Sequence, residues 1–344
     1  MATLLETVHE GIASAVEQTA PNPLGLTSFF ARQPATGTRY INMDKGFSRA
    51  RTASFVNPKA VADGTEKLSF SREPFMLPTI QDMQSINGED LEAFGIGEWD
   101  NANERSLDRV DRRIAKIHED QRRMVDAKVG LSAIEVAFEG KLTVVGKGEN
   151  RVLDFGRDES LKIDVGAVDE AEYWTSPTSD KAKHIEDALE TMGGFGMTGD
   201  VMVGRHATIR NFIRDENIMK TLDNRRIEKG NFIFDSMLAT QGMVYHGEYI
   251  GVKIFSFDGS YQKQDGTQEK AVPSNKVVII ASNNNNIIQP AVTPILTKGN
   301  VAIDSEEFMT VVTQEKRNVD IEAMQTIAPL EAGVGSFCTL TVEA

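Results

Sequence analysis

The strongest periodic pattern in the chain lies in residues 104–128, where apolar side chains recur at helical spacing. Their separations of three, four, three and seven positions place them on one narrow stripe. They are Leu107, Val110, Ile114, Ile117 and Met124. The other faces are densely charged, and a helix of this length spans roughly 37 Å at ~1.5 Å per residue. The pattern predicts a long helix that lies across a surface and ends or bends at Gly130, with a coiled coil as the alternative.

The region before this helix has strand signals but little to bury. Residues 38–43 and 67–71 alternate weakly, as strands do. The polar segment between them holds few larger apolar residues, among them Phe55, Val56 and Val61, too few for a core of its own. This composition predicts an extended segment whose partner lies elsewhere, and a mobile surface insertion is the alternative.

The remaining pattern consists of short elements of both types. An amphipathic stretch over residues 4–16 fits a helix of a few turns, and residues 141–145 and 151–155 fit a hairpin. Further expected elements are a helix that begins after the capping cluster 176–180 and ends at Gly193, a strand at 201–203, helix faces at 209–213 and 218–222, a strand at 249–257, a turn at Asp265, a buried strand at 277–281, and two antiparallel strands at 319–324 and 336–342. The mixture without regular alternation predicts an α+β fold.

Composition narrows the function classes. The chain has 344 residues with 37 Lys+Arg and 51 Asp+Glu, a formal net charge of −14. Binding to a phosphate backbone needs an excess of Lys and Arg, so nucleic-acid recognition as the main role is disfavoured. The longest apolar run, 277–281, is far shorter than the ~18 residues of a membrane span. No secretory signal is present at the start, and we expect a soluble protein made in a reducing cytosol.

Candidate chemistry is sparse. Cys338 lies in an alternating run and is expected to be a half-buried strand residue, and the five histidines show no metal-ligand spacing, with His118 and His184 expected on solvated helix faces. One acidic run could hold a divalent metal, although a solvated loop fits its spacing better. It comprises Asp164, Asp169, Glu170 and Glu172. We therefore expect no catalytic, cofactor-binding or metal-binding residues and no enzymatic activity.

Several segments, in order from about Leu24 to the C-terminus, resemble one family. The segments are 26–30 (Leu-Thr-Ser-Phe-Phe), the hairpin region 141–159 ending Asp-Phe-Gly-Arg-Asp-Glu, the segment 212–226 ending Lys-Thr-Leu-Asp-Asn-Arg-Arg, and 324–330 (Met-Gln-Thr-Ile-Ala-Pro-Leu). Together they are similar to the major capsid protein of lambda-like tailed phages. The first 20 residues show no such likeness.

The resemblance implies the Hong Kong 97-type capsid fold, an α+β fold with an N-terminal arm, an extended two-stranded loop (the E-loop), a peripheral domain with a long spine helix, and an axial domain. The expected division is an arm at 1–37, the E-loop at 38–85, a peripheral domain at 86–196 with the spine helix at 104–128, an axial domain at 197–318, and strands that return to the peripheral domain at 319–344.

The resemblance also implies a role. The expected function is that of a major head protein, which assembles into hexamers and pentamers of an icosahedral shell around double-stranded DNA in the bacterial cytoplasm and stays in the virion. Expected partners are further copies, a separate scaffolding protein, a portal and a decoration protein, with no membrane and no cofactor. Contacts between subunits are expected at Tyr40, Ile41, Phe55, Leu68, Phe70, Leu107, Val110, Ile114 and Ile117. The alternatives are an encapsulin-like nanocompartment or prophage-derived shell, and a metal-dependent hydrolase built on the acidic run.

Overall fold

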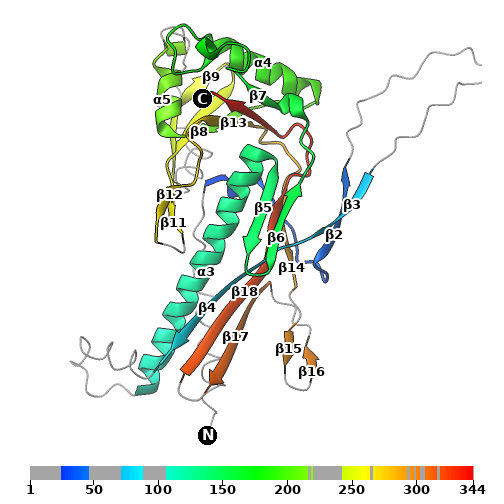
Figure 1. Ribbon diagram of the computed structural model, residues 1–344, viewed down its shortest axis with the longest axis vertical. Helices are drawn as coiled ribbons and strands as arrows, with labels where there is room; N and C mark the ends of the chain where they lie inside the picture. The colour runs from blue at the N-terminus through cyan, green and yellow to red at the C-terminus, as the bar shows by residue number, and fades with distance from the viewer. Residues whose placement is uncertain are drawn as a thin grey trace, which may run out of the picture.

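The computed structural model describes residues 25–45, 71–87, 106–215, 218–219, 242–263, 266–292, 295–297, 300–302, 307–315 and 318–343. Figure 1 shows an elongated subunit in which a long helix, α3 (Ser106–Glu139), joins an upper lobe to a lower layer of strands. Most of the strands belong to two sheets, and α3 packs against both of them. The helix therefore connects the two halves of the subunit.

The upper lobe is a six-stranded mixed sheet. Its strands, in spatial order, are β7 (Lys162–Asp164), β19 (Phe337–Thr341), β13 (Lys276–Ile280), β8 (Val201–Gly204), β10 (Val252–Phe257) and β9 (Met243–Tyr249). One face packs on α4 (Lys181–Gly194), α5 (His206–Ile213) and the 3₁₀ turn η2 (Glu159–Leu161), and another 3₁₀ turn, η3 (Glu170–Glu172), lies nearby. The other face packs on the end of α3 and on η1 (Gly25–Phe29). Because both faces are covered, the central strands are apolar throughout.

The lower layer is a five-stranded sheet centred on the long strand β18 (Asn318–Leu330). Its other strands are β1 (Ala31–Arg32), β14 (Ile287–Ala291), β17 (Phe308–Glu315) and β4 (Thr79–Ile86). β4, β14 and β17 all pair antiparallel with β18. The helix α3 crosses one face of this sheet, where Ile86, Ile114, Ile117 and Ile321 form a small buried cluster.

The described residues also form four two-stranded ribbons. They are β2 (Tyr40–Lys45) with β3 (Ser71–Met76), β5 (Lys141–Gly146) with β6 (Glu149–Asp154), β11 (Ser260–Gln262) with β12 (Gln268–Lys270), and β15 (Ile295–Thr297) with β16 (Asn300–Ala302). The predicted hairpin at 141–155 is confirmed as β5 and β6. The strands β11 and β12 pair antiparallel on either side of the predicted turn, although Asp265 itself lies outside the described residues.

The long helix is confirmed, but its predicted end was wrong. α3 continues past Gly130 to Glu139 and stops at Gly140, whose backbone has φ +68°. Met124 of the predicted stripe is 51% exposed, so the buried face passes instead through Gln121 and Val125, and beyond Val125 the last turns are buried on nearly all sides. Ala133, Ile134, Val136, Ala137 and Phe138 fill the main core there. The change from a half-exposed to a buried environment hides this part of the helix from a search for periodicity.

The prediction of two strands near the C-terminus is confirmed, but the prediction that they pair with each other was wrong. The runs at 319–324 and 336–342 both form strands, but β18 belongs to the lower sheet and β19 to the six-stranded sheet, so they do not pair. Cys338 is fully buried, not half-buried, because β19 lies between β13 and β7 with both faces covered. The predicted strand at 249–257 is two strands, since the chain turns at Ile250 and Gly251, both with positive φ.

The buried cluster between the six-stranded sheet and the helices α4 and α5 crosses the predicted boundary between the peripheral and axial domains. Leu161, Ile185 and Met192, placed before residue 197, share a cluster with Ile254 and Val277, placed after it. The strand β4 belongs to the lower sheet, so the two-stranded part of the expected E-loop ends at Met76 instead of residue 85. The arm also joins the body earlier than expected, because β1 pairs with β14 and Leu26 is buried.

Candidate assembly surfaces

The ribbon of β2 and β3 leaves the body of the subunit on one side, well clear of α3 and the two sheets (Figure 1). Its root alternates between inward and outward side chains. Ile41 packs on the main core opposite the buried Phe75, whereas the neighbouring Tyr40 is 66% exposed. One face of the root therefore belongs to the subunit's own core, and the other presents an aromatic side chain to solvent.

The root of this ribbon is fastened to the hairpin β5–β6. The ring of Phe75 stacks on Phe155 with centroids 6.0 Å apart, and the N–H of Leu77 donates to the carbonyl of Arg39 at 2.8 Å. Glu149 lies 4.0 Å from the guanidinium of Arg39. Aromatic stacking and buried area hold the ribbon at a defined angle, while the half-exposed ion pair adds little.

The predicted contact residues fall into three groups. Tyr40 and Ile41 lie at the ribbon root. Phe55, Leu68 and Phe70 lie outside the described residues, and for Leu107 and Val110 only the helical backbone is described. Ile114 and Ile117 are 1% and 2% exposed within the cluster between α3 and the lower sheet. Both side chains pack inside the subunit's own core, so within this fold they have no surface to offer a neighbouring subunit.

A polar layer under α3 was not expected from the sequence. His118 is 1% exposed rather than solvated, and within the described part of the chain neither ring nitrogen has a hydrogen-bond partner. Burial lowers the pKa of His118 to about 4. One turn further on, the amide of Gln121 donates to the carbonyl of Ile321 at 2.9 Å. The sequence signal was present, since the apolar stripe contains a glutamine at position 121, but it does not show that a sheet covers the helix.

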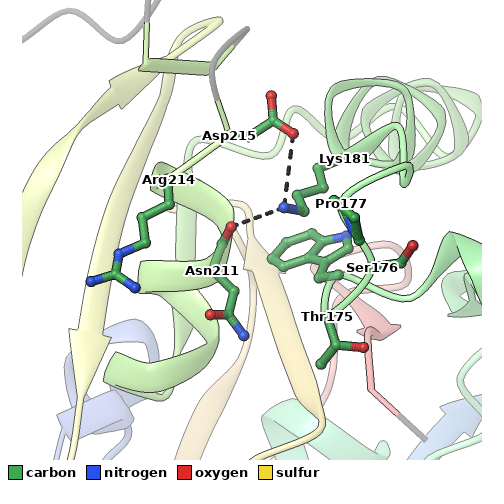
Figure 2. A pocket seen from close by; sticks show the side chains of 8 residues that line it. Thr175, Ser176, Pro177, Lys181, Asn211, Arg214 and Asp215 are labelled. Carbon is green, nitrogen blue, oxygen red and sulfur yellow. Dashed lines mark hydrogen bonds and ion pairs between the residues drawn. The ribbon is translucent and has the colours of Figure 1, made fainter.

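A hollow of about 510 Å³ lies between α4 and α5 in the upper lobe. Figure 2 shows Lys181 reaching across it, where its ammonium group donates to the carbonyl of Asn211 at 3.0 Å and lies 3.8 Å from Asp215. Trp174 is buried in its wall and donates to Nδ1 of His184, which faces Glu172. Burial lowers the pKa of His184 and Glu172 opposes that change. These groups join the two helices, and no nucleophile lies beside a general base here.

The acidic run takes part in turns. The carboxylate of Asp169 accepts from the N–H of Ala171 at 2.9 Å, and that of Asp164 accepts from the N–H of Gly166 at 3.1 Å. Among the described residues, no three His, Cys, Asp or Glu side chains are grouped as metal ligands. The described helices also include none long and apolar enough to cross a membrane.

Two findings from known proteins bear on this architecture. The family model for phage major capsid protein E matches residues 10–332. This chain belongs to the phage major capsid protein E family. The match begins at residue 10, so the family likeness starts earlier than the predicted residue 24. A comparison with curated proteins gives no match.

Solved structures of phage-derived proteins share the fold of this subunit. A protein assigned as the capsid protein of a prophage in Escherichia coli CFT073 superposes with a TM-score of 0.68 at 14% identity, covering 97% of this chain and 98% of that one. A phage-related protein from Bordetella bronchiseptica RB50 gives 0.52 at 11% identity, covering 96% and 95%. The predicted Hong Kong 97-type fold is confirmed, and with the family match the chain is a shell-forming capsid protein of the virion.

Proposed function

We propose that this capsid protein assembles into the hexamers and pentamers of an icosahedral phage head around double-stranded DNA, and that the β2–β3 ribbon lies across a neighbouring subunit. The observation that carries the proposal is the ribbon itself. Its inner face is anchored through Ile41 and Phe75, while Tyr40 has no covering layer in the described part of the subunit. A two-stranded ribbon has little stability alone and gains it from a partner surface.

The wider role follows from membership in the family. We propose a structural role without a reaction, assembly in the bacterial cytoplasm, and partners that comprise a separate scaffolding protein, a portal and a decoration protein. Many weak contacts per subunit would hold such a shell, because closure turns each later contact into an intramolecular one. The charge of −14 supports enclosure of DNA without adhesion to it.

A shortened ribbon tests the proposal. Removal of residues 38–85 would also delete β4 and the buried Leu77, so loss of assembly would have two explanations. Replacement of residues 43–73 by Asn-Gly joins Asn42 to its partner Pro74 through a two-residue turn and leaves the root intact. We expect a folded variant with the wild-type unfolding midpoint that forms no shells by negative-stain microscopy. Shells of normal size from this variant would refute the proposed role of the ribbon.

A further inference from the structure

The outer face of α4 is acidic. Glu186, Asp187 and Glu190 lie on one side of the helix, opposite Ile185 and Met192, which pack on the sheet. All three carboxylates are exposed, and no ion pair holds them within the described part of the chain. Lys183 shares this face, so three carboxylates against one ammonium group leave a net charge of −2. We call these four residues the α4 face.

A basic hollow lies beside the start of α5. It encloses about 260 Å³ and is lined by Arg205, His206, Ala207, Arg210, Asp258 and Lys270. Three cationic groups against one carboxylate leave a net charge of +2. The carboxylate of Asp258 lies 3.9 Å from the guanidinium of Arg205 and accepts from the backbone N–H of His206 at 3.3 Å. The ammonium group of Lys270 donates to the backbone carbonyl of Asp258. Arg210 is exposed and has no carboxylate partner among the described residues. The guanidinium of Arg210 and the ammonium group of Lys270 therefore have no carboxylate paired with them among the described residues.

These two surfaces sit on different sides of one rigid lobe. α4 packs over β19, near one edge of the six-stranded sheet, and α5 packs over β8 and β10, near the other. Figure 1 shows the two helices on opposite sides of the lobe. The hydrogen bond from Lys181 to the carbonyl of Asn211 joins α4 to α5 (Figure 2). Trp174, in the loop before α4, packs on Phe212 of α5 with ring centroids 5.0 Å apart. The distance between the surfaces is therefore a fixed property of the subunit.

We propose that the α4 face of one copy docks into the basic hollow of the next, so that the upper lobes form a closed ring. This inference rests on the proposed function and names the contact that would build each capsomer. Opposite charges of equal size on two different surfaces favour a head-to-tail contact between copies and oppose a contact of like surfaces. A head-to-tail contact closes into a ring when the rotation between copies closes. Since both surfaces are exposed, added salt weakens the contact.

Charge reversal tests this contact, because reversing the charges of one surface should abolish ring formation and reversing those of both surfaces should restore it. Variant A carries Glu186→Lys and Glu190→Lys, and variant B carries Arg210→Glu and Lys270→Glu. We expect each alone to lose ring formation, measured by native mass spectrometry, because like charges then face each other. A mixture of A and B should form rings, but only with an even number of subunits, because each A must lie between two B. The chain with all four substitutions should regain rings of every size that the wild type forms.

Controls separate folding and function from the contact itself. Circular dichroism should show wild-type melting for A and B, since all four side chains are exposed. The double variant Lys147→Glu with Glu170→Lys reverses two exposed charges elsewhere and should assemble like the wild type. A wild-type chain that stays a monomer would contradict the proposed function. Wild-type assembly together with unaffected A and B, or with no rescue by mixing or combination, would overturn this inference and leave the function standing.

Discussion

Arg157 and Glu331 form a buried ion pair at the junction of the two halves of the subunit. The guanidinium donates from Nε to Oε1 of Glu331 at 3.0 Å and from Nη2 to Oε2 at 2.8 Å, and both side chains are at most 5% exposed. It also donates to Thr339 and to the carbonyl of Val136. The end of α3, the β6–β7 connection and the β18–β19 connection therefore meet at one side chain. Burial raises the pKa of Glu331, and the charge of Arg157 opposes that rise.

Replacement of Arg157 by Met should destabilise the subunit by about 3–5 kcal/mol, because it leaves a buried carboxylate without its partner. The double variant R157M/E331L should recover most of this loss, since it removes both charges. Urea unfolding of the isolated subunit measures both effects. Arg123→Met is the control, because the Arg123–Glu119 pair is exposed and contributes at most about 1 kcal/mol. Equal losses in the single and double variants would show that the site depends on shape and not on charge pairing.

The buried His118 should make the subunit sensitive to acid. Its pKa is about 4 in the folded state, below the value of ~6.5 in an unfolded chain, so the unfolded state binds the proton first. Its contribution to stability is present above pH ~6.5 and is lost as the pH falls to about 4, by up to roughly 3 kcal/mol.

The variant His118→Met isolates this effect. Its free energy of unfolding should fall less than that of the wild type between pH 6.5 and 4. Other charged groups of the same layer are Asp82 on β4, by strand alternation with Ile86, and Arg113, Arg122 and Asp126 on α3, and all of them remain in the variant. Parallel stability curves for the two proteins would contradict the assignment.

Gly140 should be intolerant of any side chain. Its φ of +68° is rarely adopted by other residues, and an added Cβ would lie 2.9 Å from Cβ of Arg157. Gly140→Ala is therefore expected to lower the melting temperature and to cost about 1–3 kcal/mol. The matched change Gly193→Ala meets no atom within 4 Å in α4 and should stabilise by about 0.5–1 kcal/mol. Similar effects at both positions would contradict a role for backbone conformation at Gly140.

Neighbouring residues at the ribbon root should separate stability from assembly. Ile41→Ala removes part of the main core and should cost about 1–2 kcal/mol in urea unfolding. Tyr40→Ala changes an exposed side chain and should leave unfolding within about 0.5 kcal/mol while reducing the yield of shells in sedimentation. A destabilised Tyr40→Ala subunit, or normal shell yield from it, would argue against an intersubunit role for this face.

Much of the fold could be predicted because many of its helices and strands are marked by sequence patterns within a few neighbouring residues. The hairpin β5–β6, the helix α4 with its cap at Asp180, and most of α3 are set by spacing and capping over a few residues. The end of α3 and the pairing of β18 and β19 could not be predicted, because a residue buried on every side shows no period and a strand does not encode its partner. The family resemblance supplied the architecture that these local signals left open.

The candidate assembly surfaces also include features that the sequence predicts and features that arise only from packing. Composition is enough to predict that a strand pair poor in apolar residues precedes a long charged helix, since it limits what a segment can bury. Packing of the folded chain places Ile117 against a sheet of the same subunit and buries His118 beside it. Packing also puts α4 and α5, with their opposite charges, on opposite sides of one lobe. Contacts between residues distant in the chain arise from packing of whole elements, which no short stretch of sequence contains.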